Sequence, residues 1–223
     1  MDYRYEKKYF LSAETAAVLK RRIAAALPPD SHSGGIYRVN NVYFDDFNLS
    51  FYNQKENGAY NRDKYRLRFY NNNLSFIRLE RKHKDGELSY KESAQVSAAL
   101  FKALVNGEAD FAQKFPEVLS DSKHAVFWSN FINLYRLRRL KPTAQFSYIR
   151  EAYFHKTANV RITFDSCIGG NSKDISGVLE VKYTHFIPRF ISGLLNGANL
   201  THTEMSKYCM VLNREAKLNV KFH

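Results

Sequence analysis

The segment Tyr65-Arg66-Leu67-Arg68-Phe69 alternates basic and apolar residues. Side chains two positions apart in a β-strand share a face of the sheet, so both arginines lie on one face and the apolar residues on the other. The segment Arg78-Leu79-Glu80-Arg81-Lys82 repeats this pattern, with Arg78, Glu80 and Lys82 together. The two segments predict strands with one charged and one apolar face.

The same spacing recurs in other segments that are expected to be strands. It groups Arg4, Glu6 and Lys8; Ser89 and Lys91; Arg161, Thr163 and Asp165; and Glu180 and Lys182. Taken alone, each group is typical of the solvent-facing side of a half-exposed strand. Edge strands use lysine to block aggregation, but six strands cannot all be edges. The repetition favours a closed antiparallel sheet, packed on helices outside and charged inside, around a polyanion.

The whole sequence, residues 1–223, is expected to form a single α+β domain. It contains no long linker, repeat or low-complexity segment. Helices are expected from Ser12 to Leu27, from Val96 to Asn106 and from Ser122 to Leu140, with further helical segments at the end of the chain. Besides the first strand, strands are expected over 37–44, 64–70, 74–82, 88–95, 143–155, 159–166 and 178–184.

The net charge indicates an anionic partner. There are 34 Lys and Arg against 22 Asp and Glu, a formal charge of +12. Two like charges about 6 Å apart repel by roughly 3 kcal/mol at an effective dielectric near 20, and a bound phosphate chain would relieve this repulsion. Inward carboxylates would suit a divalent cation that bridges phosphate oxygens. A salt bridge, such as one between Glu80 and Lys82, is the alternative for each carboxylate; for Glu180 the metal is favoured.

The sequence gives little support for a cysteine or histidine site, a membrane span or a nucleic-acid-binding function. Cys167 and Cys209 lack the spacing of a metal site or redox motif, and the seven histidines lack that of a metal site or catalytic triad. The N-terminus has no apolar signal core, and no apolar run approaches the roughly 20 residues of a membrane span. We therefore expect a soluble, cytoplasmic protein. Nucleic-acid binding is not expected either, because the segment 135–139 is interpreted as an amphipathic helix with a solvated basic face.

Seven short segments carry a resemblance to a known family. They are Glu6-Lys7-Lys8-Tyr9, Tyr65-Arg66-Leu67-Arg68, Leu79-Glu80-Arg81-Lys82, Tyr148-Ile149-Arg150, Val160-Arg161-Ile162-Thr163-Phe164-Asp165, Leu179-Glu180-Val181-Lys182 and Ser206-Lys207-Tyr208. Their order and spacing resemble the VTC domain, the polyphosphate polymerase module of the vacuolar transporter chaperone family, which belongs to the triphosphate tunnel metalloenzymes. The similarity covers residues 3–213.

The resemblance implies an eight-stranded antiparallel tunnel with a polar, basic interior. It implies that phosphates are bound by Lys8, Arg66, Arg68, Lys82, Lys91, Arg150, Arg161 and Lys207. All of these except Lys91, together with Glu180, are the expected catalytic residues. Glu180 is the expected ligand of Mn²⁺ or Mg²⁺, and Glu6 is a second candidate. The pair His83-Lys84 departs from the Thr-His pair common in eukaryotic members, with no essential role attached to it.

The implied activity is metal-dependent transfer of the γ-phosphate of ATP to a growing inorganic polyphosphate chain. Two alternatives stay open: a tripolyphosphatase or nucleoside triphosphatase of the same fold, and a module that binds polyphosphate without turnover. The sequence has neither the phosphate-sensing region nor the membrane helices of the eukaryotic proteins. We therefore expect coupling to translocation to lie outside this polypeptide, and the sequence identifies no membrane or regulatory partner.

Overall fold

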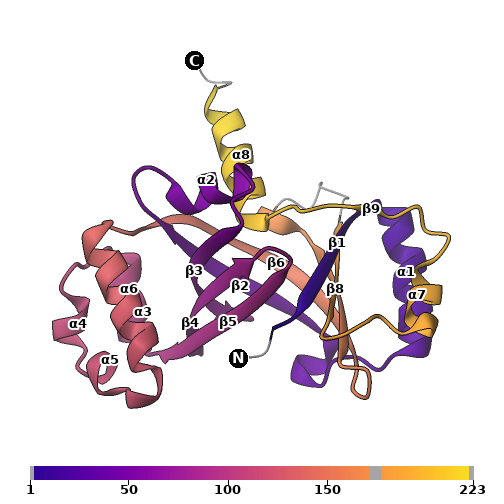
Figure 1. The fold of residues 1–223 in the computed structure, drawn as a ribbon, viewed down its shortest axis with the longest axis horizontal. Helices are drawn as coiled ribbons and strands as arrows, with labels where there is room; N and C mark the ends of the chain where they lie inside the picture. The colour runs from indigo at the N-terminus through magenta and orange to yellow at the C-terminus, as the bar shows by residue number, and fades with distance from the viewer. Residues whose placement is uncertain (1–2, 171–176, 221–223) are drawn as a thin grey trace.

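A computed structural model describes residues 3–170 and 177–220, and one antiparallel sheet dominates it (Figure 1). The strand order is β5-β4-β3-β2-β6-β7-β8-β1-β9. The strands are β1 (Tyr5–Leu11), β2 (Ile36–Asp45), β3 (Asn61–Tyr70), β4 (Asn73–Asp85), β5 (Leu88–Val96), β6 (Lys141–His155), β7 (Val160–Ser166), β8 (Gly177–Tyr183) and β9 (Thr201–His202). The first eight correspond to the eight strands expected from the sequence.

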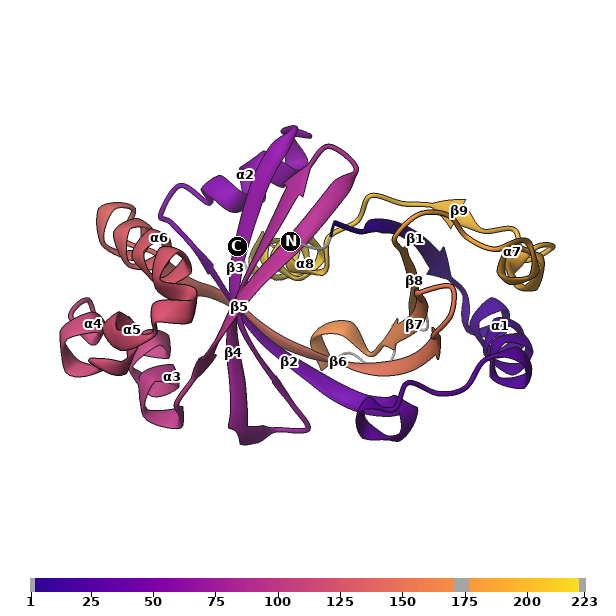
Figure 2. The same cartoon turned by 60° about the horizontal axis from the view of Figure 1, so that its bottom comes forward.

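The sheet is strongly curled, as the view in Figure 2 shows, and the segment before β1 meets β5 at the opposite edge. The backbone amide of Arg4, just before β1, donates to the carbonyl oxygen of Ser89 in β5 at 3.1 Å, and the reverse bond measures 3.2 Å. Farther along the same edge of β1, Tyr9 and Phe10 pair with the short strand β9. By its strand pairing the sheet is open, and among the described residues the isolated bridge between Arg4 and Ser89 brings its two edges together into the expected tunnel.

Helices cover the outer face of the sheet on two opposite sides (Figure 1). One group comprises α3 (Ala98–Val105), α4 (Phe111–Lys114), α5 (Glu117–Ser120) and α6 (Ala125–Leu137), and the other comprises α1 (Ala13–Ala26) and α7 (Arg189–Leu195). The outward residue Leu67 belongs to the core under the first group, and Val181 belongs to the core under the second. Because the apolar face is buried outside, the charged face is left inside.

Two more helices stand at one end of the tunnel, α2 (Ser50–Glu56) and α8 (Lys207–Val220) (Figure 1). The buried carboxylate of Asp45 links them. It accepts the backbone amides of Phe51 and Tyr52 at 2.9 and 3.0 Å, and the Tyr208 hydroxyl of α8 at 2.7 Å. The Tyr208 ring also stacks on Tyr43 of β2, with centroids 4.9 Å apart. These contacts fix the start of α8 at the tunnel mouth.

The helices expected from the sequence begin as their caps indicate. The side chains of Ser12 and Ser97 accept the amides of Thr15 and Leu100, each at 3.2 Å. The helix expected over 122–140 is a short 3₁₀ turn followed by α6, and the basic residues of 135–139 are exposed as expected. Within residues 3–170 and 177–220, no helix is both long enough and apolar enough to cross a membrane.

Candidate functional site

The inward side chains line two hollows that share six residues. The shared residues are Glu6, Arg66, Arg68, Lys82, Arg150 and Lys182. The first hollow, here called the α8 chamber, is also lined by Lys8, Lys64 and Lys207. The second, here called the Arg4 chamber, is also lined by Arg4 and Arg161. The two chambers therefore adjoin at these six charged side chains, here called the waist of the tunnel.

Glu80 organises the wall formed by β3, β4 and β5. Its carboxylate is 1% exposed and accepts two bonds from Arg66, at 2.9 and 2.7 Å, and one from Lys91, at 2.9 Å. Arg68 lies 3.6 Å away. Burial alone would raise the pKa of Glu80, but these cations hold it well below its ordinary value. Glu80 therefore stays ionised and keeps Arg66 extended into the tunnel.

Asp165 joins the opposite wall to α8. Its two carboxylate oxygens each accept a bond from Arg150 of β6 at 2.6 Å, and Lys207 of α8 lies 2.6 Å away. Lys207 also donates to Glu180 of β8 at 2.5 Å. Burial would lower the pKa of Lys207, but Asp165 and Glu180 raise it above its ordinary value. Lys207 is therefore a charged ammonium held inside the tunnel.

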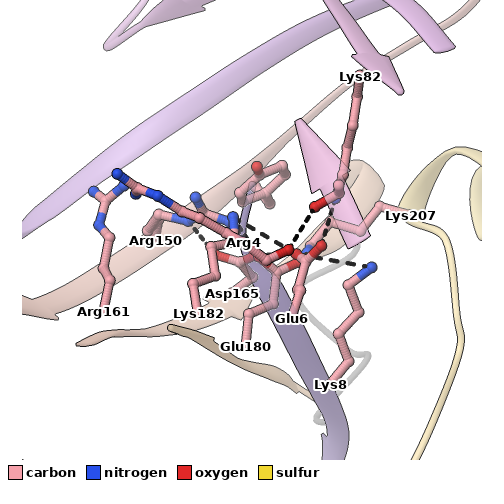
Figure 3. A network of polar contacts seen from close by, with 12 residues as sticks. Arg4, Glu6, Lys8, Lys82, Arg150, Arg161, Asp165, Glu180, Lys182 and Lys207 are labelled. Carbon is pink, nitrogen blue, oxygen red and sulfur yellow. Dashed lines mark hydrogen bonds and ion pairs between the residues drawn. The ribbon is translucent and has the colours of Figure 1, made fainter. Parts of the chain in front are cut away.

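A third cluster surrounds Glu6, at the centre of Figure 3. Its carboxylate pairs with Lys82 and lies 3.9 Å from Lys8 and 3.6 Å from Lys182. Lys182 also lies 3.3 Å from Glu180, so one ammonium sits between two carboxylates. Although burial opposes ionisation, the three lysines hold the pKa of Glu6 far below its ordinary value.

The carboxylates around Lys182 could supply some, but not all, of the ligands of a divalent cation. Glu6 and Glu180 are buried, ionised carboxylates that already share one cation, and oxygen ligands of this kind suit Mg²⁺ and Mn²⁺. Within the described residues, however, no group of three or more His, Cys, Asp or Glu side chains is arranged to hold a metal. Oxygen atoms of a phosphate ligand would have to complete the coordination.

All eight cations expected to bind phosphate line the tunnel. Arg161 lies in the Arg4 chamber, where it contacts Asp30 at 2.6 Å and donates to the Tyr37 hydroxyl at 3.0 Å. Lys91 lies at the rim, with its side chain 49% exposed. The salt bridge considered between Glu80 and Lys82 does not form, because Glu80 pairs with Arg66 and Lys91, and Lys82 pairs with Glu6.

Sequence reasoning gave no role to several residues of the tunnel. Asp165 and Lys182 are on the predicted charged faces, yet nothing in the pattern indicates that they bind other tunnel residues. Lys64 shares the face of Arg66 by the same alternation and could have been found from it. Asp30 lies outside the helices and strands, and only the tertiary fold brings it to Arg161.

Solved structures of similar fold support this architecture. A putative adenylyl cyclase from Hippeastrum, described as having a dominant triphosphatase activity, is 13% identical with a TM-score of 0.61, over 96% of each chain. A protein from Pyrococcus horikoshii OT3 is 12% identical with a TM-score of 0.54, over 95% of this chain and 99% of its own. A putative adenylate cyclase from Bacillus halodurans is 15% identical with a TM-score of 0.50, over 92% and 96%.

At these identities the likeness shows that the fold is shared, and nothing beyond the fold. No curated protein sequence matches the chain. The model of the VTC domain family matches residues 3–214, nearly the whole length and including every tunnel residue described above. The chain therefore belongs to the VTC domain family.

Proposed function

We propose that this protein is a polyphosphate polymerase, which transfers the γ-phosphoryl group of ATP to the end of an inorganic polyphosphate chain and releases ADP. The observation that carries the proposal is that two chambers adjoin at a shared waist of five basic side chains and one carboxylate. A donor triphosphate and a long acceptor can approach the waist from opposite mouths. Membership of the VTC domain family and the likeness to a structure described as a triphosphatase support a phosphate-transfer enzyme.

The tunnel residues suit phosphoryl transfer because that reaction depends on positioning and charge neutralisation. Its transition state is loose and carries charge on the outer phosphate oxygens. Arg66 and Arg150, from opposite walls, line the tunnel with guanidinium groups, and the N–H groups that Glu80 and Asp165 leave free can donate to phosphate oxygens. A terminal oxygen of the acceptor chain attacks the γ-phosphorus directly, so no Ser, Cys or His nucleophile is required.

The buried carboxylates hold these cations in place before the substrate arrives. Each of the pairs Arg66–Glu80 and Arg150–Asp165 fixes an arginine whose side chain would otherwise be free to rotate. Glu180, with Glu6, would hold Mg²⁺ or Mn²⁺, which supplies neutralisation of charge on bridging phosphate oxygens when bound. Lys207 brings a further ammonium from α8 to the same end of the tunnel.

Hydrolysis of a triphosphate is the second candidate, and the triphosphatase activity described for the Hippeastrum protein favours it. In that case water would take the position of the acceptor phosphate. The two candidates share their residues and differ in the nucleophile.

Incubation of the protein with ATP and Mn²⁺, followed by phosphorus NMR and gel electrophoresis, tests the proposal. Long-chain polyphosphate together with ADP is the expected product, and a Glu180→Gln variant should lose it. Orthophosphate as the sole phosphate product would replace the polymerase with a hydrolase. Tight polyphosphate binding without turnover would leave a binding module.

A further inference from the structure

The positive charge of the α8 chamber is only partly balanced. Arg62 and Lys84 both pair with Glu204, at 3.5 and 3.2 Å, and the side chain of Glu204 is 56% exposed. Deeper in the tunnel, in contrast, Glu80 and Asp165 are buried partners of the arginines. The net positive charge therefore increases from the waist toward the α8 mouth.

Lys64 is a cation of this chamber that no carboxylate of the described residues balances. Its ammonium donates to the Ser206 hydroxyl at 2.6 Å and lies 5.8 Å from the centre of the Tyr208 ring. Among the described residues no carboxylate lies within ion-pair distance of it. An ammonium without a carboxylate partner is costly to bury, and an anion bound beside it would offset that cost.

The charged groups that face Lys64 are mostly of its own sign. Lys8 of β1, Lys82 of β4 and Lys55 of α2 repel its charged form. Cys209 of α8 favours that form only as a thiolate, and burial raises the pKa of this thiol. Burial together with these lysines lowers the pKa of Lys64 to about 7. An anion bound beside Lys64 should therefore contribute more binding free energy than one bound beside a cation that already has a carboxylate partner.

Lys64 also continues a row of cations. Lys64, Arg66 and Arg68 occupy alternate positions of β3 and share the inner face. Residues two apart on a strand are about 6.6 Å apart along it, so the row extends outward from the waist by one position. A phosphate chain that leaves the arginines along β3 reaches Lys64 next.

We propose that Lys64, held by Ser206, forms a phosphate subsite beyond the one for the triphosphate, and that the polyphosphate chain passes through the α8 mouth. The proposal rests on the proposed function in one respect, namely that the tunnel binds polyphosphate. Tripolyphosphate fills the arginine-lined waist, whereas only a longer chain extends to Lys64. Lys64 thus favours long chains over short ones.

Isothermal titration calorimetry of the metal-free full chain with tripolyphosphate and with long-chain polyphosphate tests this subsite. Lys64→Met should weaken binding of the long chain by about tenfold, the factor that matches one hydrogen bond to a charged group. Binding of tripolyphosphate should change by less than about twofold, a small fraction of one such bond. Lys64→Arg should retain long-chain binding, and the exposed Lys102→Met serves as the control for the loss of one charge.

Unchanged long-chain affinity in Lys64→Met, or equal losses for both ligands, would overturn the subsite. The melting temperature of the free Lys64→Met variant should not fall, because the substitution removes a half-buried charge that no carboxylate of the described residues balances. This measurement checks that the variant folds. Turnover is measured separately, so the two proposals can fail independently. A protein that binds as described but makes no polymer keeps the subsite and loses the polymerase, and one that binds no long chain loses the subsite.

Discussion

At the scale of single residues, the tunnel is a set of cations that buried carboxylates hold in place. Asp165 shows the arrangement most clearly, since it is fully buried and contacts Arg150 and Lys207 from two different elements. Buried ion pairs contribute little net stability, but removing one partner leaves the other charge uncompensated. The carboxylates thus make a tunnel of like charges tolerable before phosphate enters.

Asp165→Ala should therefore lower the free energy of unfolding by about 3–5 kcal/mol, the cost of an unpaired buried charge. Urea denaturation measures this loss. Asp110→Ala is the matched control, because Asp110 pairs with Lys114 at 3.3 Å on the surface with its side chain 59% exposed. The control should lose less than about 1 kcal/mol. Similar losses in both variants would mean that Asp165 does not hold its partners as described.

The proton of Lys64 gives the tunnel a defined pH dependence. Its pKa is about 7 in the folded chain against 10.5 for an ordinary lysine, because of burial and the neighbouring lysines. Between these values the unfolded chain holds one more proton, so the contribution of Lys64 to the free energy of unfolding rises with pH. Phosphate binding requires the ammonium and has the opposite dependence.

The affinity for long-chain polyphosphate should consequently fall as pH rises above about 7, by at most about tenfold per pH unit. Phosphate groups are already ionised there, since their second pKa lies near 6. Titration calorimetry of the wild type and of Lys64→Arg measures the effect. The arginine variant should show a flatter profile because its side chain keeps its proton. Identical profiles would remove Lys64 as the cause.

At the scale of elements, α8 is positioned by its first residues. Tyr208→Phe removes the hydroxyl that bonds Asp45 at 2.7 Å and keeps the ring that stacks on Tyr43. It should lower the free energy of unfolding by about 1 kcal/mol and loosen the docking of Lys207. Hydrogen exchange should become faster in α8 and stay unchanged in α3. Unchanged exchange in α8 would show that the stacking alone positions the helix.

Most helices and strands can be predicted from the sequence, but a few cannot. The eight long strands follow from period-two alternation and turn residues, and α1 and α3 follow from their serine caps. Helix α2 begins after Leu49, a non-glycine residue in left-handed conformation, and its first amides donate to the carboxylates of Asp45 and Asp46 just upstream. The strand β9 has two residues and exists because β1 offers an edge there. The strand β9 therefore has no local signal of its own.

At the scale of the whole molecule, two apolar shells outside the sheet leave the charges inside. The alternation predicted correctly that Arg66, Lys82 and Glu180 lie inside the tunnel. It could not show which carboxylate pairs with which cation, since Glu6 of β1 and Lys82 of β4 meet only across the tunnel. The division into two chambers likewise depends on the curl of the sheet.

The same closure makes the polyanion site sensitive to salt. With a net charge of +12, part of the affinity for polyphosphate is long-range attraction that counterions screen. Raising the ionic strength from about 0.1 M to about 1 M shortens the screening length from about 10 Å to about 3 Å, so long-chain binding should weaken. Calorimetry at the two salt concentrations measures this. Affinity that does not depend on salt would contradict binding through the tunnel cations.

The most direct test of the central claim follows the γ-phosphate itself. The protein is incubated with Mn²⁺ and ATP that carries a radioactive γ-phosphate, and the products are separated on a gel before and after digestion with an exopolyphosphatase. The account predicts label in long chains that the digestion removes, and no such chains from Arg66→Ala. Label found only in orthophosphate, or chains that Arg66→Ala makes equally well, would contradict transfer inside this tunnel.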